Sequence, residues 1–360
     1  MKIAIIGASG FVGLRLVERF HLEGKAEVVP IVHAYRSLAV LARFSLPWRV
    51  TDPTNADQLA EALKGCDAVV HAALADAGQI VTMAEALYPA AQKAGIKRIV
   101  ALSSAAVHTL MPAVGTTDES TPIVKQKSEY NVAKAKAELI LTRARESGSV
   151  ELVQLRPSII HGPRSRLVAD IAQQLQVGSA WLVGDGSAIC NAIAVDNLID
   201  AIWLALTKPE ADKNVFLVND RETITWRDLY ASIATAVGTD LSRVHSITPP
   251  AFPDSASQKL ARLAAKKSAM AVMPAIPKVV KRLAKAAAAA LPEPVMADGW
   301  KLPSATSPQI SEEMCQLQSC QWRLPIAKAE RVLGYAPALS FNEAMKRTAA
   351  WLQFTGIARK

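Results

Sequence analysis

The chain has 360 residues, of which 51% are hydrophobic, and a formal net charge of +9. This length and hydrophobic content suffice for one large folded unit or for a domain that carries a second lobe. No stretch reaches the ~18 consecutive apolar residues of a membrane span, and an apolar segment begins at Lys2, so we expect neither a membrane span nor an export signal. The 4 cysteines and 6 histidines lack the spacing of a metal site. We therefore expect a cytoplasmic protein without a bound metal.

Short apolar segments alternate with amphipathic segments up to about residue 160, which is typical of a parallel, doubly wound α/β sheet. The predicted strands are Lys2–Ile6, Glu27–Val32, Trp48–Val50, Ala68–His71, Arg98–Leu102 and Val150–Leu155, and the predicted helices cover 10–22, 55–64, 79–94 and 127–147. In such sheets ligands bind beyond the carboxyl ends of the strands. The residues that follow these strands are therefore the first candidates for a site.

A glycine-rich segment follows the first predicted strand and leads into the first predicted helix. It reads Gly7-Ala8-Ser9-Gly10-Phe11-Val12-Gly13. Gly7 permits a tight turn, Gly10 lets backbone amides approach a pyrophosphate, and Gly13 lets the helix pack closely on the strand. The spacing is Gly-x-x-Gly-x-x-Gly, and its position between strand and helix predicts dinucleotide binding. The expected contacts in this segment are Gly7, Ser9, Gly10, Phe11, Val12 and Gly13.

Tyr130 and Lys134 lie four residues apart on a predicted helix, so their side chains share one face. A neighbouring ammonium lowers the pKa of a phenol, which would make Tyr130 usable as an acid or base near neutral pH. The structural alternative is a half-buried ring beside a solvated lysine. The pair alone does not decide between these interpretations.

The chain resembles the extended short-chain dehydrogenase/reductases, also called the NAD-dependent epimerase/dehydratase family. The resemblance rests on the glycine segment and on seven further segments: His71-Ala72-Ala73, Leu102-Ser103-Ser104-Ala105-Ala106-Val107, Tyr130-Asn131-Val132-Ala133-Lys134, Leu155-Arg156-Pro157, His161-Gly162-Pro163, Val195 to Ala201, and Leu333-Gly334-Tyr335-Ala336-Pro337. It implies a Rossmann domain over 1–160. It also implies cofactor contacts from Ala72, Ala73, Ser103, Tyr130, Lys134, Pro157 and Ile159, in addition to the glycine segment.

The same resemblance implies the catalytic set. Ser104 would hold the substrate oxygen, Tyr130 would transfer the proton, and Lys134 would lower the pKa of Tyr130 and bind the nicotinamide ribose. Ser104 is preferred to Ser103 because Ala-Ala-Val follows it, as in the family, and because successive residues of a strand point to opposite faces. Two serines that simply end a strand are the structural alternative.

The choice between NAD and NADP depends on the end of the second predicted strand. A carboxylate there recognises the ribose hydroxyl of NAD, whereas an arginine pairs with the extra phosphate of NADP. The segment Ile31 to Ser37 has no carboxylate and contains Arg36, which favours NADP slightly over NAD. Asp52 resembles the family's adenine-contacting aspartate, although Pro53 follows it where an apolar residue is more usual.

Residues 161–360 are predicted to form a smaller, discontinuous substrate lobe. Asn214–Val218 is expected to return to the sheet as a last strand, and Asp196 is expected to cap a helix that begins near Val195. The arginines of the 161–166 turn face either an anionic substrate group or solvent. Of the net charge, +7 falls in the segment 254–291, where an amphipathic helix is expected either to cover the site as a lid or to contact an anionic membrane. Nucleic acid is not an expected partner, because no aromatic residues alternate with these charges.

These observations predict an NAD(P)-dependent oxidoreductase that transfers hydride between nicotinamide and a secondary alcohol or ketone. The insertion before Leu333 also resembles the 3β-hydroxysteroid dehydrogenase-like subgroup. A sugar-nucleotide epimerase or dehydratase that retains its NAD is the alternative, and a nucleotide-binding sensor without turnover is a second one. The expected partners are a small-molecule substrate and a second copy of the chain in a homodimer.

Overall fold

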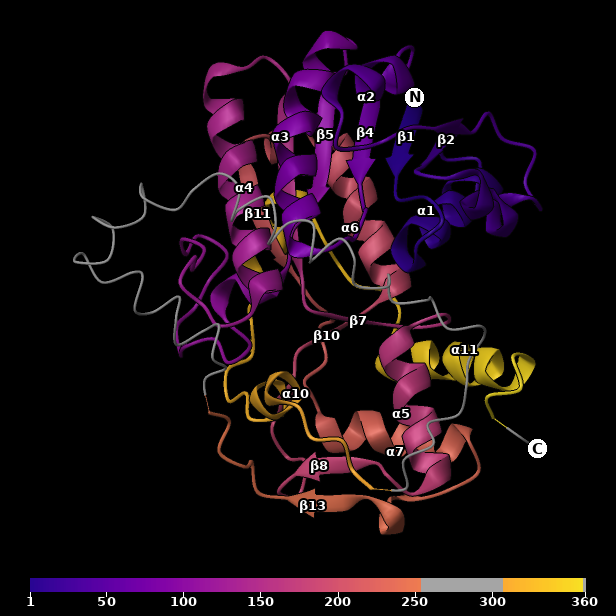
Figure 1. Ribbon diagram of the computed structural model, residues 1–360, viewed down its shortest axis with the longest axis vertical. Helices are drawn as coiled ribbons and strands as arrows, with labels where there is room; N and C mark the ends of the chain where they lie inside the picture. Colours follow the sequence, from indigo (N-terminus) through magenta and orange to yellow (C-terminus); the bar gives the residue numbers. More distant parts are fainter. Residues whose placement is uncertain (254–306, 359–360) are drawn as a thin grey trace, which may run out of the picture.

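The computed structural model describes residues 1–253 and 307–358. Its centre is a seven-stranded parallel sheet in the order β11-β6-β5-β4-β1-β2-β3 (Figure 1). The strands are β1 (Lys2–Ile6), β2 (Glu27–Val32), β3 (Arg49–Val50), β4 (Ala68–His71), β5 (Arg98–Leu102), β6 (Glu151–Pro157) and β11 (Asn214–Val218). The six predicted strands are all present, and the strand expected at 214–218 pairs with β6.

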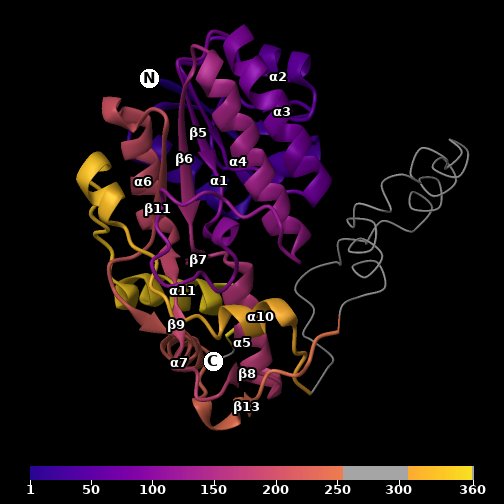
Figure 2. The ribbon, with the colours of Figure 1, turned by 90° about the vertical axis from the view of Figure 1, so that its left-hand side faces the viewer.

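Helices cover both faces of this sheet, which makes it doubly wound (Figures 1 and 2). On one face, α1 (Phe11–Leu22) and α6 (Val195–Thr207) pack on a core that includes Ile3 and Ile5. On the other, α2 (Ala56–Leu63), α3 (Ala77–Lys93) and α4 (Glu129–Ser147) pack on a core that includes Ala4 and Ile6. Alternate residues of β1 thus enter opposite cores, which explains why the strand is apolar throughout.

A smaller lobe lies beyond the carboxyl ends of the strands (Figures 1 and 2). Its helices are α5 (Arg166–Val177), α7 (Trp226–Ala236), α10 (Glu312–Leu317) and α11 (Phe341–Phe354). Short strand pairs complete it: β7 (Ile159–His161) with β10 (Ala192–Ala194), β8 (Trp181–Val183) with β13 (His245–Ile247), and β9 (Ile189–Cys190) with β12 (Ile224–Thr225). Because α6 and β11 return to the sheet between these segments, the lobe is discontinuous.

The prediction that Asp196 caps the helix at Val195 is wrong. Ala194 is the N-cap of α6, and Asp196 lies in the first turn without capping it. Its buried carboxylate accepts instead from Arg15 Nε of α1 at 2.7 Å and from Arg347 Nη1 of α11 at 3.0 Å. Asp196 therefore joins α6 to one helix of the sheet domain and to one helix of the lobe.

Two sequence predictions concern membranes. Within 1–253 and 307–358, no helix is both long and apolar enough to cross a bilayer. The basic segment 254–291 lies outside the residues that the structure describes.

Candidate active site

The glycine segment forms a close-packed turn between β1 and α1. Gly7 has φ +84°, and a Cβ atom placed on it would lie 2.7 Å from the backbone of Ala73. A Cβ on Gly13 would lie 2.1 Å from the carbonyl oxygen of Gly7. Both distances are far below van der Waals contact, so only glycine fits at either position. The predicted roles of Gly7 in the turn and of Gly13 in helix packing agree with this geometry.

The turn leaves the start of α1 available to an anion. Gly10 is the N-cap of α1 and offers no side-chain cap to the amides of the first turn, where Phe11, Val12 and Gly13 lie. Uncapped amides and the helix dipole together favour a phosphate group. A cavity of about 540 Å³ opens beside this turn, and its lining includes Ser9, Asp52 and Ala73. These residues fit a dinucleotide that lies with its phosphates against α1.

The residues that follow β2 and β3 bear on the choice between NAD and NADP. His33, directly after β2, lines the cavity, whereas Arg36 is exposed and lies outside the lining. The Asp52 carboxylate accepts from Thr54 N at 2.9 Å and Thr54 Oγ1 at 2.7 Å, and these bonds lower the pKa of Asp52. Ala72 sits at the end of β4, where its amide donates to the carbonyl of Ile6 at 2.9 Å.

The two serines after β5 have different partners. Ser103 is buried, and its hydroxyl donates to Glu138 Oε2 of α4 at 2.7 Å. Ser104 is the N-cap of a short 3-10 helix, Ala105–His108, and its oxygen accepts from Ala106 N at 3.1 Å. Ser104 lines a second cavity, described below, and hydrogen-bonds the phenol of Tyr130. The structure thus brings Ser104, rather than Ser103, to Tyr130.

Tyr130 and Lys134 lie one turn apart on α4, but the Lys134 ammonium is not among the groups that shift the pKa of the Tyr130 phenol. The Lys134 ammonium donates to the carbonyl oxygen of Leu102 at 2.9 Å, and burial lowers the pKa of Lys134 to about 8. Although 36% of the surface of Tyr130 is exposed, the protein packed around it raises the pKa of the phenol by desolvation, and the hydrogen bond with Ser104 lowers that pKa in part. Desolvation and Ser104, not Lys134, set the direction of this pKa in the structure, and the lowering of the Tyr130 pKa by Lys134 stays a prediction.

A buried ion pair anchors α4 next to this pair of residues. Glu138, one turn beyond Lys134, accepts from both Arg156 Nε and Arg156 Nη2. Arg156 Nη1 also donates to His108 Nε2 at 2.8 Å and to the carbonyl oxygens of Asp118 and Ser120. Burial and the Arg156 charge lower the pKa of His108 to about 4, so its ring is neutral and Nε2 accepts. Strand β6, helix α4 and the segment after β5 are thereby held together.

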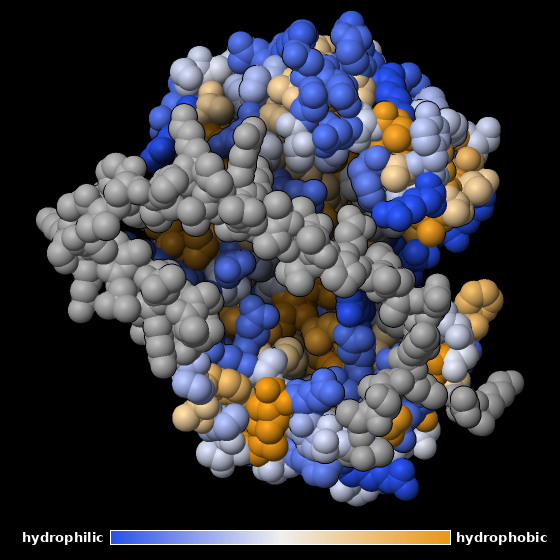
Figure 3. All heavy atoms as spheres, viewed as in Figure 1, coloured by the Kyte–Doolittle hydropathy of each residue, from blue (hydrophilic) through white to orange (hydrophobic). Residues whose placement is uncertain are grey.

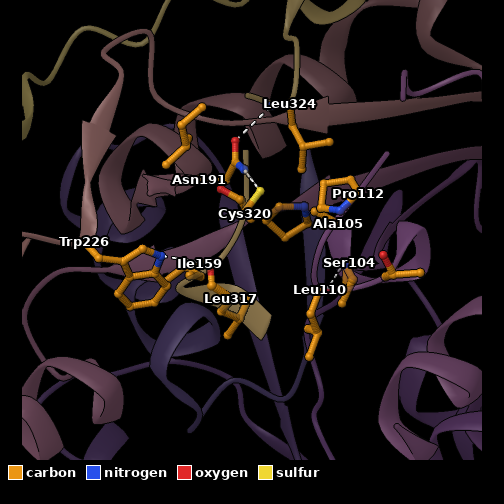
Figure 4. Close-up of a pocket in the computed structure, with 15 residues that line it drawn as sticks. Ser104, Ala105, Leu110, Pro112, Ile159, Asn191, Trp226, Leu317, Cys320 and Leu324 are labelled. Atoms are coloured by element: carbon orange, nitrogen blue, oxygen red, sulfur yellow. Dashed lines mark hydrogen bonds between the residues drawn. The ribbon is translucent and has the colours of Figure 1, made fainter. Parts of the chain in front are cut away.

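The second cavity has a volume of about 210 Å³ and lies at the carboxyl ends of β5 and β6, facing the lobe (Figure 4). Trp226 and Leu317 form one side, and Ser104 and Leu110 lie on the other. None of the described residues that line it is charged: they are Ser104, Ala105, Ala106, Thr109, Leu110, Pro112, Pro157, Ser158, Ile159, Ile189, Asn191, Trp226, Leu317, Cys320 and Leu324. The surface view shows hydrophobic residues deep in the hollow between the two parts of the molecule (Figure 3).

Pro157 and Ile159, two predicted cofactor contacts, line this second cavity. The arginines of the 161–166 turn do not line it, and both Arg164 and Arg166 are exposed.

Most of the cavity wall was not predicted from the sequence, including Trp226, Leu317 and Leu324. These residues come from distant segments and carry no common motif, so only the folded lobe identifies them. Glu138 had a detectable signal, because it continues the four-residue spacing of Tyr130 and Lys134.

Comparison with known proteins places this geometry in a family. The profile of the NAD dependent epimerase/dehydratase family matches residues 3–219. The sterol-4-alpha-carboxylate 3-dehydrogenase (decarboxylating) of Candida albicans is 30% identical over 62% of this chain and 72% of its own length. The UDP-glucose 4-epimerase of Vibrio cholerae is 26% identical over 66% of this chain and 76% of its own.

Among solved structures, the dTDP-glucose 4,6-dehydratase DesIV from Streptomyces venezuelae, with NAD bound, superposes with a TM-score of 0.70 at 20% identity, covering 99% of this chain and 98% of that one. That likeness concerns the fold. The family profile covers more than half of the chain and includes the glycine turn, Ser104, Tyr130 and Lys134. The chain is thus an enzyme of the NAD-dependent epimerase/dehydratase family, the extended short-chain dehydrogenase/reductases.

Proposed function

We propose that this enzyme interconverts a secondary alcohol and a ketone carried on an apolar carbon skeleton. The observation that carries the proposal is the uncharged cavity at Ser104, whose described lining is mostly aliphatic or aromatic. A cavity of this kind favours apolar ligands and uses its few polar groups to orient them. The bound nicotinamide supplies the hydride acceptor or donor, and the residues named below handle the oxygen and its proton.

In the proposed roles, Ser104 donates a hydrogen bond to the reacting oxygen and Tyr130 exchanges a proton with it. Their hydrogen bond to each other supports a shared position for that oxygen. Lys134 is proposed to bind the cofactor ribose, which is compatible with an ammonium that spends one of its three donors on Leu102. The dinucleotide is proposed to contact Gly7 to Gly13, Asp52, Ala72, Ala73, Ser103, Pro157 and Ile159.

The test is a set of steady-state assays with NADPH and NADH that follow the nicotinamide absorbance. We expect reduction of apolar ketones, such as a steroid ketone and a long-chain β-keto ester, and no turnover of UDP-glucose. Tyr130→Phe keeps the ring but removes the exchangeable proton, so kcat should fall about 100-fold to 10,000-fold. Unchanged turnover in this variant would contradict the proposed mechanism, because another group would then have to supply the proton.

Sugar-nucleotide epimerisation is the second candidate, and the relative from Vibrio cholerae favours it. Such a substrate carries a diphosphate, and buried phosphates need cationic or backbone donors. No described residue in the lining of the Ser104 cavity supplies a positive charge. Purified protein that retains NAD and inverts UDP-glucose without added cofactor would overturn the dehydrogenase assignment.

For the cofactor we propose NADP, with Arg36 as the partner of its extra phosphate. The support is the absence of a carboxylate between Ile31 and Ser37 and the presence of one arginine there. Arg36→Ala should raise KM for NADPH about tenfold and leave KM for NADH unchanged. Arg43→Ala is the matched control, because this arginine is exposed on the following segment and pairs with Glu18. Equal effects on both cofactors would overturn the role of Arg36 as the partner of the extra phosphate.

We also propose that the protein is a cytoplasmic homodimer. Light scattering on the purified protein tests the assembly. Contact of the segment 254–291 with anionic lipid is tested by co-sedimentation with phosphatidylserine vesicles. The full-length protein is compared with a variant in which all lysines and arginines of 254–291 are replaced by glutamine, and only the unmodified protein should sediment with the vesicles.

A further inference from the structure

Ser158 is a partly buried serine whose hydroxyl oxygen is shielded from solvent and hydrogen-bonds none of the described residues. It lies between the end of β6 at Pro157 and the start of β7 at Ile159. Its Oγ atom is shielded from solvent, and Ser158 lines the cavity that also contains Ser104. A buried hydroxyl without a partner lowers stability, because its bonds to water are lost and not replaced. Such a group in a native structure calls for a functional reason.

The other polar side chains of this cavity are already used within the protein. Thr109 donates to the carbonyl of Met111 at 2.8 Å. Asn191 donates to the carbonyl of Trp322 at 2.9 Å and accepts from Leu324 N at 2.9 Å. The Trp226 indole donates to the carbonyl of Leu317 at 3.0 Å. The cavity therefore offers two hydroxyls to a ligand: Ser104, whose hydroxyl meets the phenol of Tyr130, and Ser158.

The sheet places these two hydroxyls at neighbouring strand ends. Strands β5 and β6 are parallel, with Leu102 opposite Leu155, and Ser103 N continues the ladder by donating to the Leu155 carbonyl at 2.8 Å. In this register Ser104 falls opposite Pro157, and Ser158 is the next residue. Adjacent strands are about 4.8 Å apart. One small substrate can thus meet both hydroxyls only if its two polar groups are close together.

We propose that Ser158 determines substrate specificity by hydrogen bonding a second oxygen-bearing group, which lies near the carbon whose oxygen is held by Ser104. This inference rests on the proposed oxidoreductase function and adds a feature of the substrate. Because the described lining carries no cation, the second group is an uncharged oxygen, such as an ester, keto or hydroxyl oxygen. The remainder of the substrate is apolar and lies against Trp226 and Leu317.

The test compares two substrates that differ only in this oxygen: a long-chain β-keto ester and the ketone of the same chain length without the ester. The variants are Ser158→Ala, which removes the hydroxyl, and Ser158→Thr, which retains one. Thr109→Val is the matched control, because the hydroxyl it removes belongs to the same cavity but already has a partner. Thermal unfolding of each variant verifies that it is folded.

In Ser158→Ala we expect kcat/KM for the β-keto ester to fall at least tenfold, while kcat/KM for the plain ketone is unchanged or rises. Ser158→Thr should restore part of the preference for the ester, and Thr109→Val should change both substrates in the same proportion. Equal losses on both substrates, or a higher KM for the cofactor, would overturn the role of Ser158 while the proposed function stands. Turnover of neither substrate by the wild-type enzyme would overturn the proposed function itself.

Discussion

Tyr130 holds its proton at neutral pH, because desolvation raises the pKa of its phenol above the ordinary value of 10. A protonated phenol is ready to donate to the oxygen of a ketone that is being reduced, whereas oxidation of an alcohol requires the phenolate. We therefore expect kcat/KM for ketone reduction to be constant around neutral pH. For alcohol oxidation it should rise with pH throughout the alkaline range. Measurement of both directions against pH tests this, and an oxidation rate that levels off near neutral pH would contradict it.

His71, at the end of β4, predicts a pH dependence of stability. Burial, and to a smaller extent the Lys134 charge, lowers the pKa of His71 from 6.5 to about 3. Between these values the unfolded chain binds a proton at this histidine and the folded protein does not, so the free energy of unfolding decreases as pH falls from 6.5 towards 3.

Urea unfolding at several pH values, for wild type and His71→Leu, measures this contribution. The variant should lose stability less steeply on acidification. His21→Gln, which removes an exposed imidazole of α1, is the control for the loss of any histidine. Identical acid slopes in wild type and His71→Leu would show that His71 is not the responsible group.

At the scale of elements, helix α4 is fixed against the ends of β5 and β6 by polar contacts along one face. Lys134 binds the Leu102 carbonyl, and Glu138 binds both Ser103 and Arg156. Because Tyr130 is on the same helix, these contacts also set its distance from Ser104. The contacts therefore fix the position of Tyr130 relative to Ser104.

Removal of the Glu138 charge should show how much this anchor contributes. In Glu138→Gln the guanidinium of Arg156 stays buried without its carboxylate, so we expect the free energy of unfolding to fall by about 3 to 5 kcal/mol. Asp57→Asn is the control, because it breaks the exposed Asp57–Lys93 pair and should leave stability near that of wild type. Chemical denaturation measures both. If Glu138→Gln left the free energy of unfolding almost unchanged, the other hydrogen-bond partners of Arg156 would be sufficient to stabilise its buried guanidinium.

Much of the sheet domain was predictable from the sequence, because its information is local. The strands are short apolar runs, the helices between them are amphipathic, and the glycine turn has a fixed order of small residues. The direction of the Tyr130 pKa was not predictable, since it depends on how far the folded protein desolvates the phenol. The role of Asp196 was not predictable either, because its partners Arg15 and Arg347 are distant in sequence.

At the scale of the whole molecule, the substrate cavity combines residues from Ser104 to Leu324. Its walls come from the ends of β5 and β6 in the sheet domain, from α7 and α10 in the lobe, and from the segment after α10. No window of the sequence contains enough of this wall to show its apolar character. That explains why the sequence left the substrate class open, whereas the proposal of an apolar substrate rests on the folded structure.

Binding of the dinucleotide should stabilise the whole molecule. A ligand at a hundredfold excess over its Kd adds about 2.7 kcal/mol to the free energy of unfolding, so NADPH should raise the melting temperature by several degrees. Gly10→Ala is the informative variant, because its backbone angles suit alanine, with φ −74°, while the added methyl would stand at the start of α1, 3.3 Å from the carbonyl oxygen of Gly7. We expect it to melt like wild type without ligand and to lose the NADPH shift. A full shift in Gly10→Ala would place the phosphates elsewhere.

The order in which the lobe and the sheet share the chain also affects synthesis on the ribosome. The parallel sheet gains its last strand, β11, when Val218 emerges, whereas Leu324 of the cavity wall emerges about one hundred residues later. At about 5 to 20 residues per second, roughly 5 to 20 s pass between the emergence of the last strand of the sheet and that of Leu324. All the proposed cofactor contacts emerge before the last residues of the cavity wall, so we expect nicotinamide dinucleotide to be the first ligand able to stabilise the growing protein.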